Sequence, residues 1–207
     1  MKNSSLLKSL IVAGVVGMTA GVVPVAQAAL TQGQISSMGN ASPAAVATVA
    51  AAMVSAAPAA AREQLAKDIA AYIAVNRPNL AGSVVAGICQ LVPSSAPAIV
   101  AAAVTANKSV AVAVVGAVCK VLQTQAPAIA AAAAQSDTTQ AGAIAQAAAS
   151  AAPSQALAIR DQVLAVAPGQ ADAINAGVSA GVTASADLPL ADKVAIINSL
   201  DTSTSAK

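Results

Sequence analysis

The segment Gln125-Ala126-Pro127-Ala128-Ile129 recurs along the chain at intervals of fifteen residues. Every copy has Ala in the second place and Ile or Val in the fifth, and nine copies run from Ala50 to about Ala184 without a shift in register. The copies begin at Ala50, Leu65, Leu80, Ser95, Val110, Gln125, Gln140, Gln155 and Gln170. A fixed period of this length is typical of a tandem-repeat architecture.

The residues within each unit favour a helix over the coil of a β-solenoid. Ala is the best helix former and a poor strand former, and it fills more places than Val does. Small or aliphatic side chains recur at steps of three and four residues, which places them on one helical face. In the unit that begins at Val110 they are Ala111, Val114, Val118 and Val121. We predict helices at 59–75, 80–91, 96–106, 110–122, 126–135, 140–151, 155–166 and 170–180.

Each unit also contains residues that end a helix. Proline occupies the fourteenth place in four units, where it ends one helix and leads into the next. These residues are Pro78, Pro93, Pro153 and Pro168. A turn of about three or four residues folds the next helix back antiparallel. The sequence therefore predicts an all-α fold, in which two units of fifteen residues form one helical hairpin. Stacked hairpins over residues 43–184 would make a two-layer α-solenoid of antiparallel short helices.

The first 28 residues have the pattern of a secretory signal peptide. Lys2 and Lys8 precede an apolar stretch over residues 10–23, and Ala26-Gln27-Ala28 forms a small-x-small cleavage site. The alternative is an uncleaved membrane anchor, but the apolar stretch is short and rich in glycine. We predict an exported protein of the bacterial periplasm or the extracellular space, with no transmembrane anchor after removal of the signal.

The segments that flank the predicted array differ from it. Residues 29–42 are polar, and we expect a lead-in with about one helical turn near Ile35–Met38. Asn40 and Ser42 before Pro43 form a helix-start signal. After residue 184 the period is lost, and residues 185–207 predict a capping helix at Leu190–Leu200 followed by a polar tail. An atypical terminal repeat is expected of a helical array.

Composition excludes one class of partner. The chain has 10 basic and 8 acidic residues and no His, Trp or Phe, and its only aromatic side chain is Tyr72. Two of the bases lie in the predicted signal peptide, which leaves a mature chain near zero net charge. Binding to nucleic acid requires a basic surface that matches the phosphates. We therefore expect no nucleic-acid partner.

Cys89 and Cys119 both occupy the tenth place of their units and are thirty residues apart. They would lie on neighbouring helices of one layer, and in an exported protein two cysteines are normally oxidised. We predict a disulfide between them, and the alternative is a pair of buried reduced thiols.

Glutamine opens four successive units, at Gln125, Gln140, Gln155 and Gln170. Equivalent side chains on alternate units would share one edge and form a polar surface ladder suited to repetitive recognition. The simpler interpretation is that each Gln satisfies free N–H groups at a helix start or remains in water.

Candidate catalytic groups are scattered. The eight carboxylates are distant in sequence or adjacent to bases, which is typical of solvated helix faces. Because the chain has no His, a Ser-His-Asp triad and a His-metal site are both impossible. We predict no catalytic, cofactor-binding or metal-binding residues.

These features favour a non-enzymatic exported protein, a structural or interaction module that presents a repetitive helical surface. Its partner would be an unidentified protein or another envelope component. The alternative is an ice- or surface-binding protein that uses a flat Ala-rich helical face, although Thr is sparse in the sequence.

Overall fold

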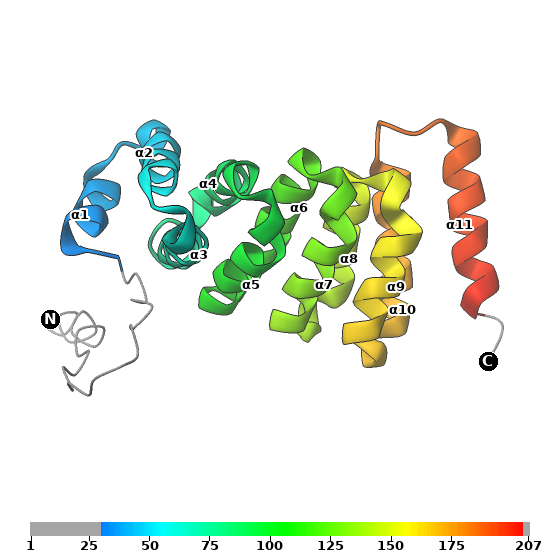
Figure 1. The fold of residues 1–207 in the computed structure, drawn as a ribbon. Helices are drawn as coiled ribbons and strands as arrows, with labels where there is room; N and C mark the ends of the chain where they lie inside the picture. The colour runs from blue at the N-terminus through cyan, green and yellow to red at the C-terminus, as the bar shows by residue number, and fades with distance from the viewer. Residues whose placement is uncertain (1–29, 205–207) are drawn as a thin grey trace, which may run out of the picture.

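The computed structural model describes residues 30–204, and this part of the chain contains helices and no strands (Figure 1). The α-helices are α1 (Gln32–Asn40), α2 (Pro43–Ala56), α3 (Ala59–Asn76), α4 (Pro78–Leu91), α5 (Ala96–Ala106), α6 (Ala111–Val121), α7 (Ala126–Ser136), α8 (Ala141–Ala151), α9 (Ala156–Val166), α10 (Ala171–Ala184) and α11 (Leu190–Thr204). The predicted all-helical class is confirmed. The signal peptide predicted for residues 1–28 lies outside the described residues.

Short 3₁₀-helices precede α5 to α10. They are η1 (Pro93–Ser95), η2 (Lys108–Val110), η3 (Gln123–Gln125), η4 (Thr138–Gln140), η5 (Pro153–Gln155) and η6 (Pro168–Gln170). Each of the helices α5 to α9 has 11 residues and each 3₁₀-helix has 3. With one linking residue, these lengths account for the fifteen-residue period.

The two fixed places of the repeated segment are core positions. The fifth-place isoleucines are fully buried, and so are the second-place alanines from Ala66 to Ala141. Those isoleucines are Ile69, Ile99, Ile129, Ile144, Ile159 and Ile174. Ala removes little surface from water, so this core needs close approach between helix backbones.

Helices pack mainly against the helix two places further along the chain. The pairs α3·α5, α5·α7 and α7·α9 are in contact, as are α2·α4, α4·α6, α6·α8 and α8·α10. Figure 1 shows the resulting row of helices, with α1 to α3 at one end and α11 at the other. Sequential helices also touch, which closes the core between the two sets.

Two terminal features differ from the sequence-based predictions. The lead-in forms a nine-residue helix, α1, instead of a single turn. Its start is stabilised by a capping box, because Thr31 accepts a hydrogen bond from the Gln34 amide while the Gln34 side chain accepts one from the Thr31 amide. Ser42 takes the N-cap position of α2, but its side chain makes no capping hydrogen bond.

No helix in the described part of the chain is long and apolar enough to cross a membrane.

Candidate functional site

Cys89 in α4 and Cys119 in α6 are both fully buried, and these two helices pack against each other. The predicted disulfide is not present in the structure, where both residues are free thiols. The pKa of each thiol is raised to about 12, mainly by burial, and for Cys119 the neighbouring Cys89 contributes a smaller part of the same rise. A thiol with such a pKa is a poor nucleophile, because only the thiolate reacts.

The oxidation state can be measured directly. If the thiols are free, native protein at pH 8 should resist alkylation, since a pKa of about 12 leaves on the order of one thiolate in 10,000. Denaturation without a reductant should then expose two reactive thiols. Protein from an oxidising compartment that carries the predicted disulfide would accept alkyl groups only after reduction, and intact-mass measurement separates the two results.

The four glutamines Gln125, Gln140, Gln155 and Gln170 occupy equivalent places, each at the end of a 3₁₀-helix and at the N-cap of an α-helix. All four are partly exposed, and none of their side chains caps the helix that follows. Gln140 alone among them makes side-chain hydrogen bonds within the described residues, to Asp137 and to the carbonyl oxygen of Lys108. Capping therefore does not explain the column, and its role as a recognition ladder remains a prediction.

A second polar column was not recognised in the sequence. Arg77, Asn107 and Asp137 are thirty residues apart and occupy the linking place before a helix of the even-numbered set. Arg77 donates to the carbonyl oxygens of Gly39 and Ala41. Asn107 donates to the carbonyl oxygen of Ala74 at 2.8 Å. These side chains tie each hairpin to the preceding one.

Asp137 holds its turn in a different way, because a carboxylate cannot donate. Its Oδ1 accepts from the Thr139 hydroxyl at 2.6 Å and from the Thr139 amide at 3.2 Å. Its Oδ2 accepts from Gln140 Nε2, which also donates to the carbonyl oxygen of Lys108. The Lys108 ammonium lies 3.8 Å from Oδ1. Asp137 is thus a buried structural carboxylate that holds the turn before η4 and does not lie on a solvated helix face.

These contacts set the pH dependence of Asp137. The hydrogen bond from the Thr139 hydroxyl lowers the carboxyl pKa below its usual 3.8, against an opposing effect of burial, and Gln140 and Lys108 lower it further. A carboxylate with a lowered folded-state pKa stabilises the fold above its unfolded pKa, and this contribution is lost as pH falls through the folded pKa. We expect Asp137→Ala to cost about 1–2 kcal/mol at pH 7, as for a lost cap.

Urea unfolding at pH 7 and at pH values below 4 tests this assignment. The difference between the wild type and Asp137→Ala should shrink as pH falls below about 4. Thr139→Val should reduce the same pH dependence, because it removes the hydrogen bond that lowers the pKa most. A difference that stays constant from pH 7 to pH 2 would show that the carboxylate charge plays no part.

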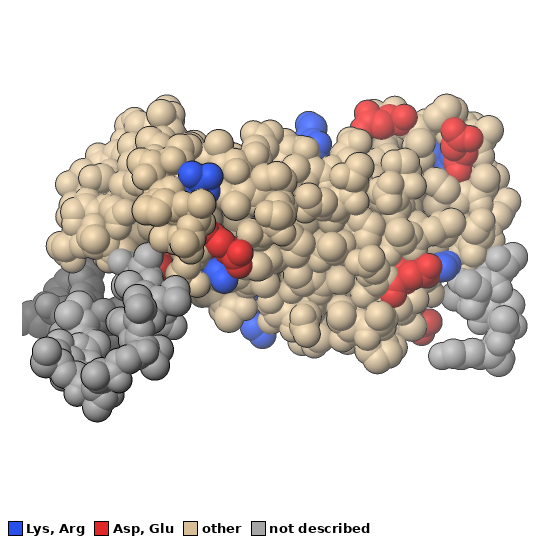
Figure 2. All heavy atoms as spheres, viewed as in Figure 1, with Lys and Arg blue, Asp and Glu red and all other residues tan. Residues whose placement is uncertain are grey.

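The remaining charges are unevenly distributed. In the odd-numbered set, α3 carries the Glu63–Lys67 ion pair and α9 carries the Arg160–Asp161 ion pair. Between them, α5 and α7 contain no charged residue. Figure 2 shows an uncharged area in the middle of this view, with charged groups around it. We call the exposed side of α5 and α7 the α5–α7 face: Ala98, Thr105, Ala106, Ala128 and Gln135.

No group of three or more His, Cys, Asp or Glu side chains in the described residues could hold a metal ion. Comparisons of the chain with protein-family models, with curated proteins and with solved structures gave no match. Other features of the described surface therefore bear on function. They are the α5–α7 face, the glutamine column, the linker column and the two ends of the helix row.

Proposed function

We propose that residues 43–184 form a two-layer α-solenoid of thirty-residue hairpins. The support is the contact between alternate helices together with the constant lengths of α5 to α9. The alternating linker column adds an independent argument. Its members Arg77, Asn107 and Asp137 recur at the spacing of the hairpin, not of the single helix.

On this scaffold the protein serves as an exported, non-enzymatic structural or interaction module of the bacterial envelope or extracellular space. The observation that carries the proposal is the uncharged α5–α7 face between helices that carry partly exposed ion pairs. Terminal repeats of an array have polar outer faces for solubility, whereas an uncharged central surface is suited to contact with a partner. Extended repeat arrays bind along such a surface instead of in one pocket.

Partner capture from the native envelope tests this function when it is combined with two matched variants. Ala128 and Ala143 both occupy the fourth place of a unit and are both exposed, but they belong to α7 and α8, in different sets of helices. We expect Ala128→Lys to abolish capture of the main partner and Ala143→Lys to preserve it. Equal capture by both variants would contradict the assignment of the α5–α7 face.

An ice- or surface-binding function is the second candidate. It is favoured by the exposed alanines Ala98, Ala128 and Ala158, which repeat at the same place in alternate helices. Thermal hysteresis and inhibition of ice recrystallisation by the purified protein are the expected results. If both assays are negative, this candidate is excluded.

A further inference from the structure

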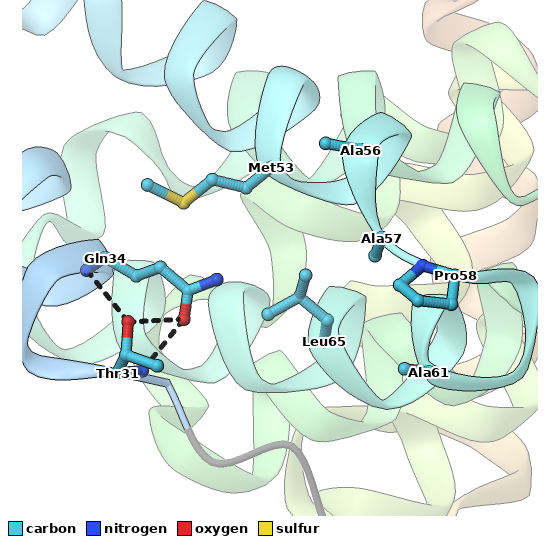
Figure 3. Close-up of a pocket in the computed structure, with 8 residues that line it drawn as sticks. All are labelled: Thr31, Gln34, Met53, Ala56, Ala57, Pro58, Ala61 and Leu65. Atoms are coloured by element: carbon cyan, nitrogen blue, oxygen red, sulfur yellow. Dashed lines mark hydrogen bonds between the residues drawn. The ribbon is translucent and has the colours of Figure 1, made fainter.

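An open apolar hollow of about 470 Å³ lies at the end of the helix row formed by α1, α2 and α3 (Figure 3). Its lining residues are Thr31, Gln34, Met53, Ala56, Ala57, Pro58, Ala61 and Leu65. The figure shows the Met53 and Leu65 side chains and the Pro58 ring around the same space. The volume is in the range of ordinary ligand sites, so it accommodates more than one aliphatic side chain.

Arg62 lies at the edge of this hollow. Its Nη2 donates to the carbonyl oxygen of Ala57, which is one of the lining residues, at 3.2 Å. Its Nε is buried without a hydrogen-bond partner, and no carboxylate among the described residues forms an ion pair with it. Within the described residues, the guanidinium therefore has a positive charge without a carboxylate partner and an N–H donor without an acceptor.

The opposite end of the row has complementary features. Leu190 and Val194 of α11 are 76% and 47% exposed, and their spacing of four residues places them on one side of the helix. Asp187 lies just before this helix, is exposed, and forms no ion pair in the described part of the chain. Asp192 is two residues from both Leu190 and Val194, so it lies on the opposite side of α11. The ammonium group of Lys193, the basic residue of α11, donates instead to the carbonyl oxygens of Thr183 and Ser185.

We propose that a second copy of this chain occupies the hollow, with the Leu190–Val194 side of its α11 against Met53, Pro58 and Leu65 and its Asp187 toward Arg62. Figure 1 places α1 to α3, whose residues line the hollow, and α11 at opposite ends of the row of helices, so the contact joins two copies and not two parts of one. The two surfaces differ, so the interface is head-to-tail and leaves one free hollow and one free α11 on every dimer. Head-to-tail association of this kind continues beyond the dimer. The proposed association does not depend on the function proposed above.

The first test is sedimentation of protein purified after expression of the full-length chain, with its N-terminus established by mass spectrometry. We expect the average mass to rise steadily with concentration and to fall as salt is added, because the charged part of the contact is screened. Leu190→Ser with Val194→Ser should weaken association by about 10–100-fold, as two aliphatic side chains lose their burial. The control is Val121→Ser, an exposed aliphatic residue in the middle of the row, which should change nothing.

A mixing experiment identifies the geometry. Ala61→Phe fills the hollow and leaves α11 intact. The Leu190→Ser, Val194→Ser variant removes the apolar side of α11 and leaves the hollow open. Each should be monomeric alone, and the mixture should form 1:1 dimers that grow no further. Circular dichroism checks that both variants remain folded, and Arg62→Glu provides a second block of the hollow. A wild type that stays monomeric at every concentration, or association unaffected by these changes, would overturn the proposal.

Discussion

Replacing Gly177 with alanine is expected to destabilise the protein by about 2–3 kcal/mol, at the upper end of the range for overpacked cores. Gly177 lies in α10 against α8, and a Cβ added to it would come far closer than 3.0 Å to the carbonyl oxygen of Gly142. A Cβ added to Gly181, one turn later, would also come closer than 3.0 Å to a backbone atom, the carbonyl oxygen of Gln146. These obstacles are backbone atoms and not flexible side-chain ends, so relief requires the two helices to move apart.

A glycine without such a neighbour provides the matched control. Gly87 lies inside α4, and an added Cβ would meet nothing within 4 Å. Gly87→Ala should therefore stabilise the protein by about 0.5–1 kcal/mol, because Ala loses less backbone entropy than Gly in a helix. Thermal unfolding of the two variants should give shifts of opposite sign, with Gly177→Ala lower by about 5–10 °C for a chain of this size.

Shifts of the same sign would contradict the close approach of α8 and α10. This contact matters for the fold as a whole, because an Ala-rich core cannot rely on large side chains. Gly142, Gly177 and Gly181 allow two backbones to approach more closely than Ala permits, and dispersion between them then contributes in place of buried side-chain area.

The repeated segment is the part of the fold that the sequence predicts best. Its fifth place is buried in all nine units and its second place in all but the first and the last, because a fixed apolar place in a repeat has the same environment in every internal unit. The boundaries of α5 and α9 agree with prediction to within one residue, since proline and polar turn residues mark each end. Only one turn of the nine-residue α1 was predicted, near Ile35–Met38, because most of its residues are polar and lack a helical apolar pattern.

The linker column shows a signal that was present but not used. Along the thirteenth place, polar Arg77, Asn107 and Asp137 alternate with apolar Val92 and Leu122. This alternation has twice the period of the repeat, which indicates that neighbouring units face different surroundings. The partners of Arg77 and Asn107 are backbone carbonyl groups more than thirty residues away, so a local pattern could not identify them.

The candidate site was less accessible from sequence. The positions of Cys89 and Cys119 on packed neighbouring helices follow from the thirty-residue spacing, whereas the distance between their sulfur atoms depends on how the helices are rotated. The hollow beside Arg62 and the exposed Leu190 depend on which helices fail to cover each other at the two ends. Uncovered surfaces of this kind have no sequence pattern, because they occur where no other helix packs.

Deletion of whole units should produce the largest effect and tests the hairpin as the unit of the fold. Removing residues 95–124 deletes α5 and α6, so α7 would stack on α3 and α8 on α4. Each later helix then keeps its layer, and the contact of α8 with Gly177 and Gly181 is unchanged. A deletion of 125–154 would be less suitable, because it would place Val112 where Gly142 now approaches α10.

Removing residues 110–124 instead deletes α6 alone and ends at the same junction, Gln125. Helix α7 would then have to pack on α4 and α8 on α5, which exchanges the layers and brings Asn107 and Asp137 onto successive linkers. We expect the thirty-residue deletion to give a shorter protein that unfolds cooperatively, because each hairpin contacts mainly its neighbours. The fifteen-residue deletion should lower the midpoint of urea unfolding further, although it removes half as many residues. Both deletions remove Cys119, so a difference between them does not come from thiol chemistry. A milder effect of the fifteen-residue deletion would show that the single helix, and not the hairpin, is the unit of the fold.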